Sequence, residues 1–142
     1  MTSAGESNCR SAGAVAIFDM QSFRWFSKAK WLSEIFDPDA AVPRHHVSII
    51  WSEEHGRLWI HTRGMRKFGR PDVSVPGVPP SSRDAVIDLC NRFIEMMAFG
   101  AIVAEGQAIK MKALPAGLRC HHAGSVDDPD FNNVHLEIRW PK

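Results

Sequence analysis

The sequence predicts an α+β fold, in which a mostly antiparallel sheet carries one long and one shorter helix on the same face. Three observations lead to this prediction. Residues 86–97 carry an apolar stripe with helical spacing, residues 46–62 contain two strand-like segments around a turn, and residues 134–140 alternate between apolar and polar side chains. Because the strands come in runs and do not alternate with helices, antiparallel pairing is favoured.

Length and composition indicate one globular domain. The chain has 142 residues, of which 44% are hydrophobic and 23% are charged, and these values are ordinary for a domain with its own core. The first residues are rich in Ser, Gly and Ala and show no periodicity. We therefore expect a flexible tail over residues 1–13 and a single domain over residues 14–142.

The start of that domain predicts a strand and then a helix. Residues 14–19 are mostly apolar, as in a short strand. Four apolar residues then follow at spacings of four, three and four, which places them on one helical face: Trp25, Ala29, Leu32 and Phe36. We expect a helix over about residues 23–36, with Ser22 as its N-cap and Asp37-Pro38 as its end.

The next segment predicts a β-hairpin and a third strand. Residues 46–51 alternate in polarity, residues 52–56 form a polar loop that ends in glycine, and residues 57–62 are again strand-like. Residues 72–75 have the character of a short strand, which we expect Pro76-Gly77 to stop.

The clearest element is an amphipathic helix over about residues 82–99. Six apolar residues recur at intervals of three and four, as on the core-facing side of a helix: Val86, Leu89, Cys90, Phe93, Ile94 and Met97. Ser81 or Ser82 can cap its start, and Asp84 suits the positive end of the helix dipole. Strands are then expected over residues 107–111, 118–122 and 134–140.

The segment after the hairpin carries a distinctive phrase. Residues 60–73 read Ile-His-Thr-Arg-Gly-Met-Arg-Lys-Phe-Gly-Arg-Pro-Asp-Val. This string resembles the HTxGxxxFGxP(D/E) phrase of an uncharacterised bacterial family of domains of unknown function. The helix with Gly100 and Glu105-Gly106-Gln107 after it is similar to the segment on the C-terminal side of the phrase in that family. The resemblance covers about half of the chain. It implies kinship with proteins that have no assigned chemistry, so it transfers no catalytic role.

The same segment has two physical interpretations. Gly64 and Gly69 can adopt positive φ without steric cost, so they can define a tight crossover, with Phe68 turned into the core. The basic side chains predict instead a site for a phosphate or carboxylate, because guanidinium groups and glycine amides both bind anions. The residues of this predicted anion site are Arg63, Arg66, Lys67 and Arg70.

The sequence contains seven histidines, so we compare their spacing with the spacing that is typical of metal ligands. The pairs at residues 45–46 and 121–122 are adjacent, and adjacent strand residues point to opposite faces. No histidine pair lies at helical i, i+4 spacing in a helix. We expect no metal and no cofactor. If a metal were bound, His61, His122 and His135 would be the candidates, since they lie on three predicted strands.

Charge, cysteine content and hydropathy indicate which classes of partner and which cellular compartment the sequence favours. Seventeen basic and sixteen acidic residues leave a formal charge of +1, which does not favour nucleic-acid or membrane binding. Three widely spaced cysteines do not form a disulfide framework, and residues 1–10 lack the apolar stretch of a secretory signal. The longest apolar run, residues 96–104, is too short to span a bilayer. These features predict a cytoplasmic protein with reduced thiols.

Two functions remain open. The preferred hypothesis is a non-enzymatic binding or interaction module of the bacterial cytoplasm, with a protein partner or a second copy of the chain, because the core pattern comes without a convergent catalytic set. The alternative is a small hydrolase or transferase, metal-assisted in one version, that acts on an anionic ligand. In that case the basic loop would hold the anion and His61 or His122 would act as the general base.

Overall fold

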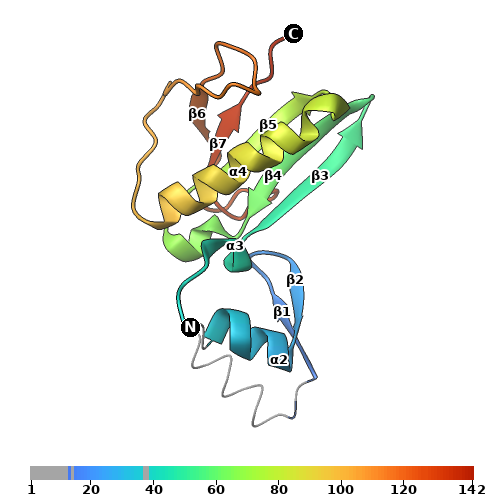
Figure 1. The fold of residues 1–142 in the computed structure, drawn as a ribbon, viewed down its shortest axis with the longest axis vertical. Coiled ribbons are helices and arrows are strands. Elements are labelled where there is room, and N and C mark those ends of the chain that lie inside the picture. The colour runs from blue at the N-terminus through green and yellow to red at the C-terminus, as the bar shows by residue number, and fades with distance from the viewer. Residues whose placement is uncertain (1–12, 14, 37–38) are drawn as a thin grey trace.

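The computed structural model describes residue 13, residues 15–36 and residues 39–142, and it confirms the predicted α+β fold. Figure 1 shows a five-stranded sheet crossed by one long helix, and below it a smaller part made of a β-hairpin and a short helix. The predicted tail and the Asp37-Pro38 helix end lie outside the described residues, except for Gly13.

The main sheet has the order β3-β4-β5-β7-β6. Its strands are β3 (Ser48–Glu54), β4 (Arg57–Arg63), β5 (Asp72–Val78), β6 (Cys120–Ala123) and β7 (His135–Ile138). The β5–β7 pair is parallel and the other three neighbouring pairs are antiparallel, so the sheet is mostly antiparallel, as predicted. The parallel pair had no signal in the sequence, because it joins segments about 60 positions apart.

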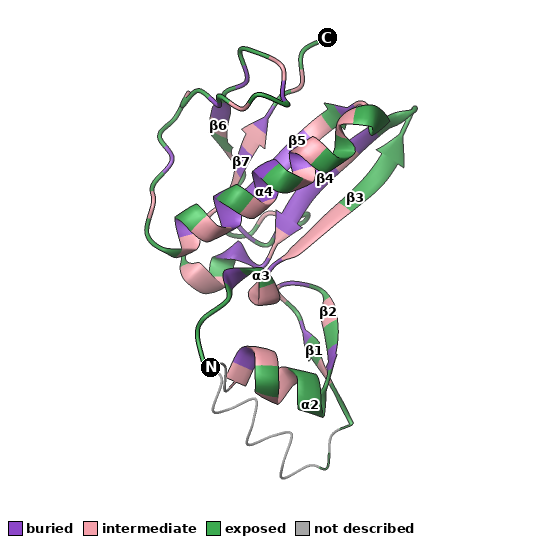
Figure 2. Cartoon of the chain, in the orientation of Figure 1, coloured by how far each residue is buried: buried purple, intermediate pink, exposed green. Residues whose placement is uncertain are grey.

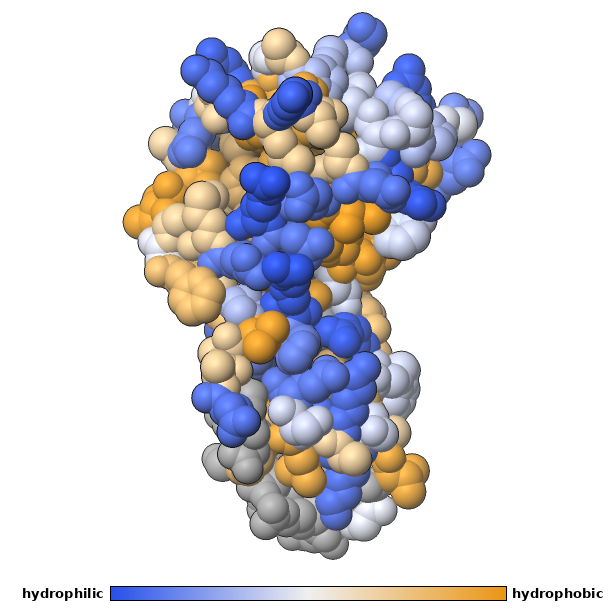
Figure 3. Space-filling model, viewed as in Figure 1, coloured by the Kyte–Doolittle hydropathy of each residue, from blue (hydrophilic) through white to orange (hydrophobic). Residues whose placement is uncertain are grey.

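Helix α4 (Arg83–Ala98) covers one face of this sheet. All six residues of the predicted stripe are buried, and they pack on buried side chains of β4, β5 and β7 such as Ile60, Val75 and Leu136. Buried residues concentrate in α4 and the strands beneath it (Figure 2). The outer face of α4 is hydrophilic (Figure 3). A short 3₁₀ helix, η3 (Pro80–Ser82), leads into α4, and the Ser82 hydroxyl makes no capping bond.

The strands of the first hairpin are longer than predicted. Residues Ser48–Glu54 pair without interruption with Arg57–Arg63, so the turn contains only His55 and Gly56 and not five residues. Both turn residues have positive φ, 52° and 74°, as tight hairpins require. Strand β5 is also longer, because it continues through Pro76 and Gly77 to Val78.

The N-terminal part corrects two predictions. The shorter helix packs against its own hairpin and not on the face of the main sheet that α4 covers, and it begins later than predicted. Residues 24–27 form strand β2 (Arg24–Ser27), which pairs with β1 (Ala16–Asp19). Helix α2 (Lys28–Trp31) begins only after Ser27, whose hydroxyl accepts a hydrogen bond from the Lys30 amide, and it continues as a π-helix, η1 (Leu32–Phe36). Ser22 therefore caps no helix. Cross-strand pairing overrode the helical spacing, and Trp25 is 71% exposed as a result.

Two short elements lie at the junction of the two parts of the molecule. Helix α3 (Pro43–His46) leads into β3, and a 3₁₀ helix, η2 (Met65–Phe68), follows β4. Gly64 and Gly69 flank η2 with φ of 119° and 65°, which confirms the predicted role of both glycines. Met65 is fully buried, whereas Phe68 only packs at the margin of the core.

The segment after α4 is mostly irregular. Residues 107–111 do not form the predicted strand, since they contribute a single bridge, Ala108 to Arg119. The predicted strands over residues 118–122 and 134–140 are present as the shorter β6 and β7. Within the described ranges no helix is long and apolar enough to cross a membrane.

Candidate functional site

A pocket of about 400 Å³ lies where the N-terminal hairpin and helix meet η2. Its volume is in the range of small-molecule sites, and its walls are mostly apolar, as such sites usually are. The apolar lining residues are Ile17, Phe18, Met20, Trp31, Ile35 and Phe68. Three further lining residues are ionisable and come from three different elements: Asp19, His46 and Lys67. The pocket thus combines an apolar interior with a polar end.

Asp19 ends strand β1, and its carboxylate accepts four hydrogen bonds. Oδ1 accepts from the backbone amides of Gln21, over 3.0 Å, and Ser22, over 3.4 Å. Oδ2 accepts from the Ser22 hydroxyl over 2.7 Å and from the Lys67 ammonium group. This local turn, in which an aspartate binds the amides that follow it, holds the carboxylate at the polar end of the pocket.

Lys67 reaches the same point from η2. Its ammonium group donates to Asp19 Oδ2 and, over 2.9 Å, to the backbone carbonyl oxygen of His46. The side chains of Lys67 and Asp19 are only 10% and 7% exposed. An ammonium group has three hydrogens to donate, and the third has no acceptor among the described residues. Lys67 itself lines the pocket, so this ammonium group can donate to a ligand bound there.

Burial shifts the pKa of all three ionisable groups. Burial lowers the pKa of Lys67 below its ordinary value, and the hydrogen bond to Asp19 offsets this only in part. Burial alone would raise the pKa of Asp19, but the hydrogen bonds from Lys67 and Ser22 outweigh it and keep that pKa low. Burial and the nearby Lys67 charge lower the pKa of His46. The Lys67 ammonium group pairs with the Asp19 carboxylate, and the lowered pKa of His46 favours a neutral imidazole beside them.

The four cations of the predicted anion site do not converge on this pocket. Lys67 alone lines it. Arg66 donates through Nη1 to the carbonyl oxygens of Val126 and Asn132, over 3.2 and 2.8 Å. The basic loop therefore divides its side chains among separate parts of the fold.

Arg70 and Arg63 also have structural partners. Arg70 donates from Nε to the carbonyl oxygen of Met97 over 3.1 Å, and from Nη2 to that of Gly100 over 3.3 Å, so it satisfies carbonyl groups at the end of α4. The guanidinium group of Arg63 lies over the Phe23 ring, 4.3 Å from its centroid. Such contacts are cation–π interactions.

The structure brings two of the three metal candidates near one aromatic ring. The Phe131 ring stacks on His135, with centroids 4.4 Å apart, and meets the edge of His61 at 5.4 Å. His122 lies elsewhere, where its Nε2 pairs with the carbonyl oxygen of Val103 over 2.8 Å. In the part of the chain that the structure describes, no three His, Cys, Asp or Glu side chains are placed to hold a metal ion.

His61 is a buried, neutral imidazole. It is 6% exposed and stacks on Trp59 with centroids 4.3 Å apart. Burial, helped by the positive charge of Arg63, lowers its pKa to about 4. A base with so low a pKa removes protons weakly at neutral pH. His61 therefore fits a packing role on the sheet better than the general-base role that the sequence suggested.

Asp19 and His46 are the site residues that the sequence patterns did not reveal. A signal for Asp19 was present, because an aspartate that ends an apolar strand and precedes a serine by three positions is typical of a turn. The interpretation of Ser22 as a helix cap concealed it. His46 contributes its backbone carbonyl and its ring, which packs edge-on against Phe68 with centroids 5.7 Å apart.

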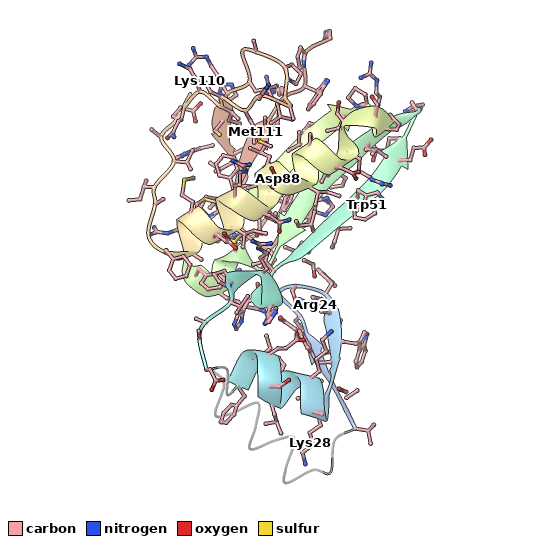
Figure 4. The ribbon with its side chains drawn as sticks, in the orientation of Figure 1. Arg24, Lys28, Trp51, Asp88, Lys110 and Met111 are labelled. Atoms are coloured by element: carbon pink, nitrogen blue, oxygen red, sulfur yellow. The ribbon has the colours of Figure 1, made fainter. Side chains whose placement is uncertain are left out.

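Arg24 completes the junction around the pocket. Its Nη1 donates to the backbone carbonyl oxygen of His45 over 2.8 Å, so β2 is tied to α3 next to the carbonyl group that accepts from Lys67. Figure 4 labels Arg24 at this junction. Two cations from different elements thus satisfy neighbouring carbonyl groups at the end of α3. The junction is therefore held by hydrogen bonds as well as by the apolar pocket wall.

Comparison with known proteins identifies no relative of this chain. No protein-family model matches the sequence, and neither a curated protein nor a solved structure gives a significant match. The resemblance of residues 60–73 to a family of domains of unknown function stays a prediction. The function is therefore inferred from the geometry of this chain alone.

Proposed function

We propose that the protein is a binding module that takes up a small, mostly apolar molecule with one hydrogen-bond-accepting head group. The observation that carries this proposal is that the Lys67 ammonium group, which lines an apolar pocket of about 400 Å³, donates to only two acceptors among the described residues. The head group would be a carboxylate or a carbonyl oxygen, since either accepts from an ammonium group. The apolar body would lie against Trp31, Ile35 and Phe68.

The expected affinity is weak. Burying roughly 150 Å² of apolar ligand surface stabilises the complex by about 4 kcal/mol. A hydrogen bond to a charged donor adds about 1.5–3 kcal/mol. Together these terms correspond to a Kd of roughly 10–100 µM. The loss of translational and rotational freedom, at least about 4 kcal/mol, opposes them, so we expect a Kd on the order of 10 mM. The ion pair at the polar end is neutral as a unit, so the head group need not carry a full charge.

Binding is favoured over catalysis by the state of the polar groups. The Asp19 carboxylate accepts four hydrogen bonds and the Lys67 ammonium group is held by two acceptors. Neither group is free to act as a base or a nucleophile, because each would first have to give up its partners. The alternative proposal is a hydrolase or transferase that acts on an anion. No contact among the described residues favours it over binding.

A titration with matched ligands tests the proposal. Decanoate, decanol and decylamine share one chain and differ in the head group. We expect decanoate to bind most tightly, because an ionised acceptor forms the stronger hydrogen bond with Lys67. We expect decylamine to bind at least tenfold more weakly, because its protonated head group cannot accept that hydrogen bond. Isothermal titration calorimetry on the full chain gives the three affinities. Equal affinity for all three ligands would contradict the proposed head-group recognition.

A pocket-filling variant locates the site. Ile17 lines the pocket from β1, whereas its neighbour Ala16 is exposed and does not line it. We expect Ile17→Trp to abolish decanoate binding because the indole ring would occupy the cavity, and Ala16→Trp to leave the affinity unchanged. Circular dichroism confirms that both variants are folded. Unchanged binding in a folded Ile17→Trp protein would place the ligand elsewhere and overturn the proposal.

A further inference from the structure

Strand β3 forms one edge of the main sheet, and its outer side has no neighbour in the strand order (Figure 1). It pairs with β4 over its full length, Ser48–Glu54, without a bulge. Because the turn has only two residues, Glu54 and Arg57 exchange ladder hydrogen bonds, and the pattern alternates from there along the strand. The backbone groups that point away from β4, towards the open edge, are therefore those of Ile49, Trp51 and Glu53.

The opposite edge of the sheet is covered. Strand β6 is the outer strand there, and its outward backbone groups have partners. Cys120 donates its amide hydrogen to the carbonyl oxygen of Gln107 over 2.9 Å, and its carbonyl oxygen accepts from the amide of Gly106 over 2.8 Å. The His122 amide donates to Glu105 Oε2 over 2.6 Å. Within the described part of the chain, the outward groups of β3 have no such partners. One edge of the sheet is thus closed and the other is open.

The sequence of β3 leaves this edge able to pair. Open edges usually carry lysine, proline or a bulge, or are covered by a loop, and these features prevent pairing with another strand. The strand reads Ser-Ile-Ile-Trp-Ser-Glu-Glu, with neither lysine nor proline, and its register with β4 is continuous. Trp51, labelled in Figure 4, is 48% exposed, and the guanidinium group of Arg83 lies over its ring, 5.8 Å from the centroid. An exposed strand of this kind can bind another extended strand through its backbone groups.

The two ends of β3 differ in charge. Glu53 and Glu54 lie at its C-terminal end. Arg57, which faces Glu54 on β4, is turned towards β5, where it donates to a backbone carbonyl oxygen over 3.3 Å. At the N-terminal end, Arg63 of β4 lies opposite Ser48. Antiparallel pairing of two copies would bring the acidic end of one strand to the basic end of the other. Parallel pairing would instead place the glutamates side by side, which is unfavourable.

We propose that β3 pairs antiparallel with β3 of a second copy of the chain, so that the two main sheets join across a two-fold axis. Trp51 is the central residue of Ser48–Glu54 and its backbone groups point outward, so an axis beside Trp51 pairs the whole strand with its copy. Ile49 then exchanges hydrogen bonds with Glu53 of the second copy. The contact is smaller than a standard interface, so we expect a Kd on the order of 10–100 µM. The pocket that Lys67 lines is not part of this contact, and dimerisation does not depend on ligand binding.

Sedimentation equilibrium of the full chain, at concentrations below and above this Kd, measures self-association directly. We expect a monomer–dimer equilibrium without larger species, because pairing of β3 with β3 uses the one open edge of each sheet and closes it. A chain that stays monomeric at millimolar concentration would overturn the proposal and would leave an extended peptide of another protein as the partner of this edge.

Proline at an outward position tests the backbone pairing. Glu53→Pro removes an N–H group that points away from β4, and proline is tolerated at such positions of edge strands, so we expect the fold to persist. The second copy loses a donor and meets the proline ring, so we expect dimerisation to weaken at least tenfold. Glu53→Ala is the matched control, since it keeps the N–H group and should change the Kd by less than about threefold. Circular dichroism confirms that both variants are folded. Unchanged dimerisation of folded Glu53→Pro would place the contact elsewhere and overturn the proposal.

Charge changes test the antiparallel orientation. In the proposed pairing Glu54 of one copy faces Ser48 of the other, beside Arg63. We expect Ser48→Glu and Glu54→Arg each to weaken self-association about threefold to tenfold, because each places like charges together at both ends of the contact. In a mixture of the two variants, the introduced carboxylate faces the introduced guanidinium group, so we expect the mixed dimer to form about as tightly as the wild-type dimer. Sedimentation of each variant and of the mixture gives the three affinities. A mixed dimer no tighter than either parent dimer would overturn the antiparallel pairing.

Discussion

The ammonium group of Lys67 donates a hydrogen bond to the carboxylate of Asp19, which lies 48 positions earlier in the chain. The same ammonium group donates to the carbonyl oxygen of His46. One side chain therefore joins β1, α3 and η2 and also provides the polar end of the Lys67 pocket. Changes at this junction test the stability of the fold and the geometry of the site together.

Replacing Lys67 by methionine leaves the buried Asp19 carboxylate without its counter-ion. We expect Lys67→Met to lower the free energy of unfolding by about 3 kcal/mol, because an uncompensated buried charge is strongly unfavourable. Urea denaturation measures the change. In the double variant Asp19→Asn, Lys67→Met the charge is also removed, so we expect it to recover part of the loss. A double variant no more stable than Lys67→Met would show that the charge is not the cause.

Gly64 and Gly69 form a matched pair at the two ends of η2. A Cβ atom on Gly64 would lie 2.5 Å from the carbonyl oxygen of His46, whereas one on Gly69 would meet nothing within 4 Å. Both glycines have positive φ. We therefore expect Gly69→Ala to lower the free energy of unfolding by about 1–2 kcal/mol through backbone strain alone. Gly64→Ala should lose more, since backbone atoms must also move. Similar midpoints in urea for the two variants would refute the close approach at His46.

The pKa of His61, about 4 in the folded protein against 6.5 in an unfolded chain, predicts a loss of stability in acid. Between these values the unfolded chain binds the additional proton, so the contribution present above pH 6.5 falls as pH decreases towards 4. Across that pH range we expect the free energy of unfolding of His61→Phe to rise by up to about 3 kcal/mol relative to that of wild type. Urea titrations at several pH values measure the difference. The His55→Asn variant, at an exposed position in the hairpin turn, is the control, and it should follow wild type.

The contribution of Asp72 to stability has the opposite pH dependence. Burial raises its pKa from 3.8 to about 6, although hydrogen bonds from Asn133 and Thr62 oppose the change. The folded protein then binds the proton more tightly, so this contribution is present below pH 3.8 and is lost as pH rises through 6. Between pH 4 and 7 we expect the free energy of unfolding of Asp72→Asn to rise by about 3 kcal/mol relative to that of wild type. A pH-independent difference between the two proteins would contradict the raised pKa.

The helix α4 and the glycines around η2 were predictable because their signals are local. The apolar stripe spans twelve positions and belongs to one helix, and all six of its residues are buried. Positive φ at Gly64 and Gly69 follows from backbone sterics at single positions. The N-terminal helix was predicted five residues too long because Trp25 fitted its apolar spacing. In the structure Trp25 lies in strand β2, because it pairs with Phe18 of β1.

The candidate site was predicted only in part. Lys67 was one of four cations of equal standing in the sequence, and the structure places it alone in the pocket. Arg66 and Arg70 instead satisfy carbonyl groups of the loop before β7 and of the end of α4. Which cation meets which acceptor depends on segments brought together by folding, and no pattern of spacing within residues 63–70 contains that information.

By itself, the sequence determined the fold class, the long helix with its buried face and the glycine-framed crossover after the hairpin. The physical reason is that periodicity and backbone sterics act over a few neighbouring residues. Only the tertiary structure decided the parallel β5–β7 pair, the ion pair between Asp19 and Lys67 and the Lys67 pocket. Each of these depends on contacts between distant segments, whose formation is governed by burial of the whole core.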